Sequence, residues 1–394
     1  MMAQPNQIYM DYSSYCPIEP RVLKEMLPYY ERYFGNPSSP HSFGVQMKAG
    51  LEGAREKVAS LINAEKPSEV IFTSGSTESI NAALRGAAFR NKEKGNRIIA
   101  SSIEHISVRN TLKYLAKNGF EVVYLPVDEY GVVSVEALKG AMNDRTVLVT
   151  VMYANNEVGT VEPIKEIADI VHEKNAILHT DATAAIGKMS IDVNRDGIDI
   201  MSISSGDTYG PYGIGALYLR RGIRFEPLIL GGGQEAGFRS GTENVAGAVG
   251  MGKAAEIAKA EMAQEAERLS KIRDRIIKGT KEAITYSFLN GHPTLRLPNN
   301  INMRFSFIEG ESLVLSLDME GIAASSGSAC SSKTLEPSHV LLAMGIPHEE
   351  AQGSLLLSLG RWNTPQDAEK LLEVLPNIVR GLREMSPIAP PGVR

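Results

Sequence analysis

Short apolar runs alternate with helical segments through the middle of the chain, and this alternation is what most constrains the fold. Most of the runs are β-branched and apolar at consecutive positions, as in strands that are covered on both faces. The alternation predicts a doubly wound α/β domain around a mainly parallel, seven-stranded sheet. The expected strands are 70–73, 97–101, 121–125, 146–152, 176–180, 199–202 and 214–219, and the expected helices between them are 79–89, 107–118, 134–141 and 163–173.

The pattern changes from about Asn244 onward. Residues 246–281 predict one long helix, because apolar residues recur at helical spacing with charged residues between them. The segments beyond it indicate a smaller α+β unit. These segments are 300–305, 312–317 and the helices 338–344 and 367–385. We therefore expect a large domain over 18–260 and a small domain made of 1–17 and 261–394.

Composition excludes several classes of partner. The chain carries 41 Lys and Arg against 46 Asp and Glu, and no long basic run stands out, so we expect no nucleic-acid partner. No apolar stretch reaches the roughly 18 residues of a membrane span, so we expect no membrane association. The two cysteines, Cys16 and Cys330, exclude a disulfide framework and a CxxC metal clip. We expect a cytoplasmic location.

Polar residues follow the expected strands at the place where ligands bind in open α/β sheets. A glycine-containing turn after 70–73 brings Ser76 and Thr77 to a helix start. There the hydroxyl and N–H groups either hold an anion such as phosphate or only cap the helix. The polar residues at the other strand ends are His105, Asn155, Asp181 and Ser204.

An acid, a histidine and an anion-binding turn together suit a phosphorylated, protonated heteroaromatic ring. Pyridoxal phosphate is such a ring, because a carboxylate holds its pyridinium nitrogen and helix N–H groups hold its phosphate. Taken singly, His105 is explained as a structural histidine and Asp181 as a cap. The set as a whole favours the cofactor.

Ten motifs carry a resemblance to a known family over nearly the whole chain. They lie at 10–13, 35–39, 73–79, 104–105, 155–160, 181–183, 209–211, 231–235, 239–244 and 325–330. With these motifs the sequence resembles the cysteine desulfurases of the NifS/IscS type, in the class V aminotransferase family. The resemblance implies the fold of pyridoxal-phosphate-dependent transferases, which is aspartate aminotransferase-like, with a large sheet domain and a smaller α+β domain.

The resemblance also implies how the cofactor phosphate is held. Thr77 and Ser204, with the backbone of Ser76, would bind it within one subunit. Thr242 would reach the phosphate of the other subunit. The resemblance therefore implies a homodimer.

Other roles that the resemblance implies concern the ring and the sulfur. His105 would stack on the pyridine ring, and Asp181 would pair with its nitrogen. Asn155 would lie near the ring hydroxyl or the substrate. Cys330, in a Ser-Ser-Gly-Ser-Ala-Cys-Ser-Ser loop, would take the sulfur of cysteine as a persulfide.

The chain departs from the family pattern at five positions. Asp207 stands where the family has the lysine that forms the Schiff base, and Gly206 stands where it has the preceding histidine. Ala184 replaces a glutamine near the ring, and Tyr212 replaces a lysine. Leu356 replaces the arginine that clamps the substrate carboxylate. A carboxylate cannot form a Schiff base, so we expect pyridoxal phosphate to be bound non-covalently or to be absent.

Cys330 is kept although the lysine is lost. A Gly/Ser-rich loop is a poor place for a cysteine that serves only as a small hydrophobe. Two uses remain open: a persulfide carrier, or one thiolate ligand of an iron–sulfur cluster that a partner mainly holds. The resemblance supplies that partner, an IscU-type iron–sulfur scaffold protein. Cys16 is interpreted as a buried filler or, alternatively, as a second redox thiol.

The sequence thus predicts a homodimer of desulfurase ancestry that acts in iron–sulfur cluster assembly together with a scaffold. Ordinary desulfurase turnover is not expected, because the amine at position 207 is missing. One alternative is a slow desulfurase that uses non-covalent pyridoxal phosphate. Another is an interaction module whose pocket no longer has a function.

Overall fold

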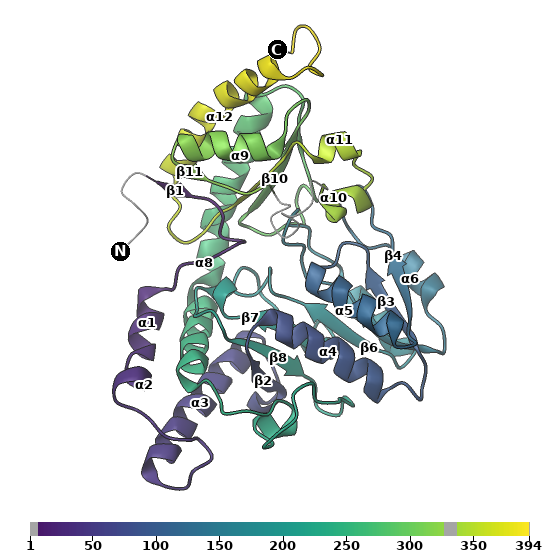
Figure 1. Ribbon diagram of the computed structural model, residues 1–394, viewed down its shortest axis with the longest axis vertical. Coiled ribbons are helices and arrows are strands. Elements are labelled where there is room, and N and C mark those ends of the chain that lie inside the picture. The colour runs from purple at the N-terminus through teal and green to yellow at the C-terminus, as the bar shows by residue number, and fades with distance from the viewer. Residues whose placement is uncertain (1–6, 327–336, 394) are drawn as a thin grey trace.

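The computed structural model describes residues 7–326 and 337–393. Its largest sheet has seven strands in the order β2-β8-β7-β6-β5-β3-β4 (Figure 1). Strand β8 runs antiparallel to β2 and β7, and the other neighbours are parallel. The strands are β2 (Val70–Thr73), β3 (Arg97–Ser101), β4 (Glu121–Leu125), β5 (Thr146–Thr150), β6 (Ile177–Asp181), β7 (Ile200–Ser204) and β8 (Gly215–Leu219). The predicted mainly parallel, seven-stranded sheet is confirmed.

Three of the seven strands have the predicted bounds, and the others differ by one or two residues at an end. Strand β5 ends at Thr150 instead of 152, and the N–H of Met152 donates to the buried Glu104 carboxyl. Strands β6 and β7 run further than predicted, so Asp181 and Ser204 are the last residues of their strands. The polar residues Asp181 and Ser204 therefore belong to the sheet itself and not to the loops that follow it.

Helices cover both faces of this sheet, which explains the consecutive apolar positions of its strands (Figure 1). One face packs against α4 (Ser76–Arg90) and α5 (Ile106–Lys117). The other face packs against α3, α6, α7 and the first half of α8. The bounds of that second group are α3 (Ser42–Leu61), α6 (Val135–Ala141), α7 (Ile164–Glu173) and α8 (Val245–Ala283).

The predicted long helix is α8, which runs without a break past the expected domain boundary at residue 260 (Figure 1). Its second half packs on a three-stranded antiparallel sheet of order β12-β10-β9. The N-terminal strand β1 pairs in parallel with β11 beside this sheet. The bounds are β1 (Ile8–Tyr9), β9 (Ser287–Leu289), β10 (Asn300–Phe305), β11 (Ile322–Ala323), β12 (Ser354–Ser358), α9 (Gly310–Met319) and α12 (Pro365–Met385). The division at residue 260 stays a prediction.

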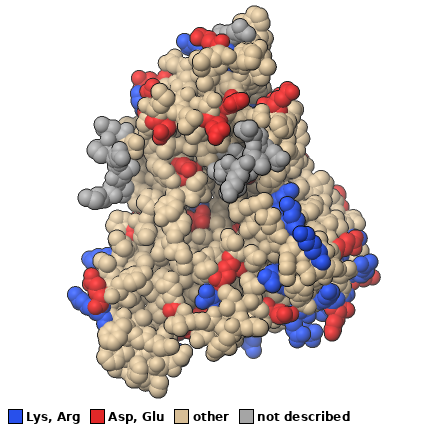
Figure 2. Space-filling view, viewed as in Figure 1, with Lys and Arg blue, Asp and Glu red and all other residues tan. Residues whose placement is uncertain are grey.

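Short helices complete the fold. They are α1 (Pro20–Met26), α2 (Pro28–Glu31), α10 (His339–Ala343), α11 (His348–Ala351), η1 (Pro67–Glu69), η2 (Gly206–Thr208) and η3 (Glu235–Gly237). Within the described ranges, no helix is both long and apolar enough to cross a membrane. On the face shown in Figure 2, acidic and basic side chains are interspersed over the described residues, with no continuous basic stripe.

A buried ion pair ties the start of the large sheet to a distant loop. Both Arg55 terminal nitrogens contact the carboxylate of Glu235, at 2.6 and 2.8 Å, and the N–H of Phe72 donates to the same carboxylate at 2.8 Å. The two charged side chains are only 8% and 2% exposed. This arrangement joins α3, β2 and η3, and β2 leads directly into the start of α4.

Candidate functional site

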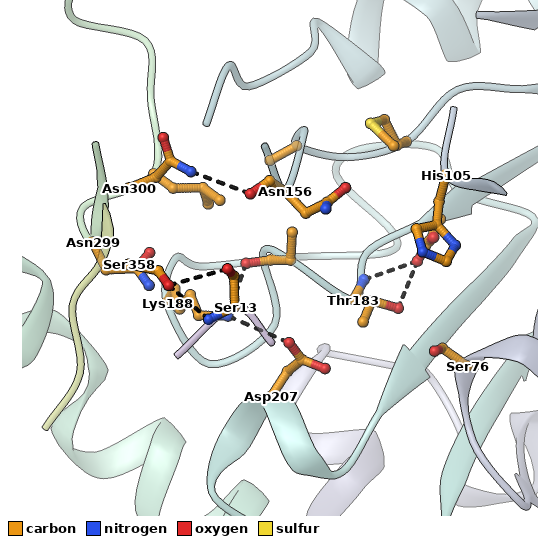
Figure 3. A pocket seen from close by; sticks show the side chains of 15 residues that line it. Ser13, Ser76, His105, Asn156, Thr183, Lys188, Asp207, Asn299, Asn300 and Ser358 are labelled. Atoms are coloured by element: carbon orange, nitrogen blue, oxygen red, sulfur yellow. Dashed lines mark hydrogen bonds and ion pairs between the residues drawn. The ribbon is translucent and has the colours of Figure 1, made fainter. Parts of the chain in front are cut away.

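A cavity of about 120 Å³ lies beyond the carboxyl ends of β6 and β7 (Figure 3). The large sheet contributes Asp181 to its wall, and the smaller sheet side contributes Asn299 and Ser358. Of the residues that the sequence singled out, the cavity brings together Ser76, His105, Asp181, Ala184 and Asp207.

The first turn of α4 borders this cavity through Ser76. Its N-cap, Gly75, has a φ of +152° and contributes no side-chain cap. Glycine suits such a backbone, and the N–H groups of the turn are left to face a ligand. Thr77 is exposed, Ser204 ends β7, and Thr242 is exposed on the surface of this subunit.

Asp181 and His105 have fixed orientations at the edge of the cavity. The Oδ1 atom of Asp181 accepts from the N–H and hydroxyl of Thr183 at 3.0 and 2.6 Å, and the residue is 6% exposed. His105 is the N-cap of α5, and its Nδ1 accepts from the N–H of Ser107 at 3.2 Å. In the neutral ring this places the proton on Nε2. The two side chains are thus held by their own strand ends.

Asp207 lies in η2, directly after β7, and points into the cavity (Figure 3). Its Oδ1 lies 3.7 Å from the Nζ of Lys188, which also donates to the carbonyl of Ala184 at 3.1 Å. Burial raises the pKa of Asp207 and the charge of Asp181 adds to this, whereas Lys188 acts in the opposite direction. Among the described residues that line the cavity, Lys188 is the one amine.

Sequence reasoning set Lys188 aside, because it follows β6 whereas the lost lysine belonged after β7. In the structure β6 and β7 are neighbours, paired from His179 to Asp181. Their carboxyl ends therefore open into the same space. The adjacency of two strands is the signal that would have found this residue.

Two other residues that the sequence singled out, Asn155 and Leu356, are buried. The side chain of Asn155 is buried, accepts from the N–H groups of Glu157 and Val158, and donates to the carbonyl of Ile103. Its neighbour Asn156 lines the cavity. Leu356 is 4% exposed in β12, so the position of the family's arginine is an apolar one here.

Cys330 lies outside the described residues, but both flanks of its segment are held. Ser325 exchanges two backbone hydrogen bonds with Leu356, at 2.7 and 3.1 Å. On the other flank, the Ser338 hydroxyl donates to the carboxyl of Glu157, and His339 Nε2 contacts the carbonyl of Glu104 at 3.0 Å. Glu104 immediately precedes His105, so the second flank is anchored at the edge of the cavity.

Cys16 is 2% exposed, and its thiol donates to the carbonyl of Tyr12 at 3.1 Å. Burial raises the pKa of this thiol to about 12, so it stays protonated near neutral pH. Its N–H donates to the hydroxyl of Tyr212, which stacks on Tyr15. These contacts favour the interpretation of Cys16 as a filler. Among the described residues, no cluster of three or more His, Cys, Asp or Glu is arranged to hold a metal ion.

Glu104 is fully buried, and its Oε1 accepts from the Ser101 hydroxyl and the Met152 N–H at 2.7 and 2.8 Å. Burial raises its pKa to about 8. The unfolded chain therefore releases this proton at lower pH than the folded chain does. For this group the free energy of unfolding should fall with rising pH between about 4.5 and 8, by about 1.4 kcal/mol per unit.

We expect Glu104→Gln to remove this contribution, because an amide imitates the protonated carboxyl. Urea unfolding at several pH values should give a shallower pH dependence for the variant than for the wild type. Glu93→Gln on the surface is the matched control. Identical slopes for wild type and Glu104→Gln would mean that the native carboxyl is ionised throughout.

Comparison with known proteins gives a consistent result. A family model described as Aminotransferase class-V matches residues 8–371. The chain belongs to the class V aminotransferase family. Its fold is that of the pyridoxal-phosphate-dependent aminotransferases, as the resemblance implied.

Individual relatives of this class V aminotransferase are named as cysteine desulfurases. Cysteine desulfurase IscS 1 of Archaeoglobus fulgidus is 56% identical over 380 residues, covering 96% of this chain and 99% of that protein. Cysteine desulfurase IscS of Clostridium botulinum is 53% identical over 384 residues, covering 97% and 96%. A solved structure named NifS-like protein superposes with a TM-score of 0.89 at 38% identity, covering 95% of this chain and all of the other.

The residues of this chain fit its family's cofactor in two respects and not in a third. The uncapped first turn of α4 suits a phosphate, and the Asp181 carboxylate in the cavity wall suits a protonated ring nitrogen. Position 207 does not suit covalent attachment, because a carboxylate replaces the amine. The cavity therefore fits a cofactor that is held by non-covalent contacts.

Proposed function

We propose that this chain acts in iron–sulfur cluster assembly as a desulfurase-like homodimer that binds an IscU-type scaffold protein. In this proposal Cys330 is the residue that meets sulfur, either as a persulfide carrier or as one ligand of a cluster that the scaffold mainly holds. The observation that carries the proposal is the Asp207–Lys188 ion pair in the cavity, where the family has a free amine. The relatives' names supply the sulfur chemistry.

Ordinary desulfurase turnover is doubtful for two chemical reasons. Asp207 lacks the amine that would form a Schiff base and move protons at the substrate α-carbon. Leu356 is buried and apolar, so no guanidinium stands at that position to hold the substrate carboxylate. Pyridoxal phosphate, when bound, supplies an electron sink for bonds at the α-carbon of an amino acid. In this chain Ser76, Thr77, Ser204, His105 and Asp181 would hold it non-covalently.

The sulfur-handling part of the proposal depends on the segment that contains Cys330. Its flanks are anchored to β12 on one side and beside His105 on the other, so the segment starts and ends near the cavity. One cysteine cannot hold an iron–sulfur cluster by itself. Iron and sulfide are therefore substrates in this proposal and not a resident cofactor of this chain.

The homodimer is proposed because Thr242 is exposed on its own subunit. An exposed hydroxyl in the motif at 239–244 is available to a second copy of the chain, as the family resemblance implies. We also propose that the dimer works in the cytoplasm. The cavity is lined by Asn156, the neighbour of Asn155. We therefore propose that Asn155 acts near the ring or substrate only indirectly, by holding the loop that contains Asn156.

A second candidate is a slow desulfurase that uses non-covalent pyridoxal phosphate. The retained Asp181 and His105 in the cavity wall favour it. Such an enzyme would release sulfide from cysteine and show the absorbance band of a bound, unattached aldehyde cofactor.

Co-purification with the cognate scaffold, with and without iron and sulfide, tests the proposal. We expect a stable complex whose absorbance shows iron–sulfur charge-transfer bands, together with little sulfide release from free cysteine. Sulfide release at rates typical of desulfurases would contradict it. Failure to form a complex under either condition would contradict it equally.

A further inference from the structure

Lys188 and Asp207 form the central charged pair of the cavity (Figure 3). Lys188 is 12% and Asp207 21% exposed in their side chains, and both line the same space. Their 3.7 Å separation is that of an ion pair without a tight hydrogen bond. Lys188 is held from the other side by the carbonyl of Ala184. The Lys188 ammonium is therefore held by a hydrogen bond within its own loop and forms an ion pair with Asp207.

Because of the other groups that face Asp207, the Lys188 ammonium is needed to balance the negative charge in the cavity. Asp181 adds a second negative charge, and burial disfavours ionisation of Asp207. Ser204 lowers the pKa of Asp207, as Lys188 does. The charge of Asp207 raises the pKa of the Cys16 thiol and of the Tyr212 hydroxyl. Among these described neighbours, Lys188 alone brings a positive charge. Without it, the cavity would hold two acids beside the helix start that suits an anion.

We propose that Lys188 is a positioning residue that neutralises Asp207 and thereby allows the cavity to take a phosphorylated pyridine ligand. The inference deepens the proposed function and depends on its non-covalent cofactor. Lys188 acts through Asp207 and does not contact the ligand. The positive charge that the family places after β7 is thus supplied here from the end of β6.

Coulomb forces inside a protein act over several ångströms. A carboxylate several ångströms from a phosphate repels it by an amount that, in a protein of effective dielectric about 20, changes affinity by roughly tenfold or more. An ammonium 3.7 Å from that carboxylate cancels most of this field. Serine and threonine hydroxyls at the helix start carry no charge and cannot do so.

A double-mutant cycle separates this mechanism from direct contact. The purified dimer would be titrated with pyridoxine 5′-phosphate, which has the ring and the phosphate but no aldehyde, so that no lysine can form an imine with it. The variants are Lys188→Met, Lys188→Arg, Asp207→Asn and Lys188→Met with Asp207→Asn. Binding is measured by equilibrium dialysis at mildly alkaline pH, because rising pH favours the ionised form of Asp207. Lys165→Met, an exposed lysine paired with Asp169 on α7, is the matched control.

We expect Lys188→Met to weaken binding roughly tenfold or more, and Lys188→Arg and Lys165→Met to retain most of the affinity. In the Asp207→Asn background, Lys188→Met should change the affinity less than about threefold, because no carboxylate is left to neutralise. Thermal unfolding of each variant without ligand confirms that it is folded.

Two results would overturn the inference. An equal loss in both backgrounds would show that Lys188 contacts the ligand, and no loss in either would show that the pair is only structural. If neither the wild type nor Asp207→Asn binds pyridoxine 5′-phosphate, the inference also fails. The scaffold complex would remain open to its own co-purification test.

Discussion

If the proposed function is correct, Cys330→Ser is expected to reduce cluster formation on the proposed scaffold complex to background, while the proposed dimer and its contact with the scaffold persist. A serine hydroxyl can neither carry a sulfane sulfur nor replace a thiolate as an iron ligand. The measurement is the charge-transfer absorbance of the complex after addition of iron and sulfide. A separate sample is incubated with a small-molecule persulfide, which can transfer its outer sulfur to the Cys330 thiolate and leave as a thiolate. Mass spectrometry of the 325–330 region then measures the added mass of one sulfur atom.

Cys16→Ser is the matched control, since the thiol of Cys16 is buried and protonated near neutral pH. This variant should form the cluster as the wild type does. If Cys330→Ser also behaves like the wild type, the chain is better described as an interaction module whose pocket has lost its function.

Glu235→Ala is expected to lower the free energy of unfolding by about 3 kcal/mol, because it removes the buried carboxylate partner of the Arg55 guanidinium, which then keeps only the half-exposed Glu52 and the Val70 carbonyl. The N–H of Phe72 would lose its acceptor in the same change. Since β2 leads into the first turn of α4, the variant should also weaken binding of a phosphorylated ligand. Urea denaturation followed by circular dichroism measures the first effect.

The exposed pair Arg275–Glu369 provides the comparison, because its side chains are 48% and 57% exposed. Glu369→Ala should change the free energy of unfolding very little, since water and salt screen such a pair. Similar losses for Glu235→Ala and Glu369→Ala would refute the assignment of stability to the buried pair.

Much of the large sheet was predictable because its strands are short, apolar and covered on both faces. Strands β2, β3 and β4 begin and end where the residue pattern changes. The ends of β5, β6 and β7 were not predictable to the residue, because they depend on neighbours such as the carboxyl of Glu104, which takes the N–H of Met152. The last residues of these three strands depend on contacts with side chains that are distant in the sequence.

The site shows the same division between local and distant information. Asp181 and His105 could be predicted, because each lies at or shortly after the end of its own strand in a recognisable pattern. The pairing of Lys188 with Asp207 could not, since it depends on β6 and β7 lying side by side. Asn155 and Asn156 are adjacent in sequence, and only the turn geometry decides which of them lines the cavity.

The pairing of β1 with β11 has a consequence for biosynthesis. Ile8 and Tyr9 leave the ribosome long before their strand partners Ile322 and Ala323 are synthesised. Met10 enters the same hydrophobic cluster as Leu371 and Leu375 of α12. The large sheet can assemble while the nascent chain is still growing, but the unit that contains β1 must wait until β11 and α12 have been synthesised.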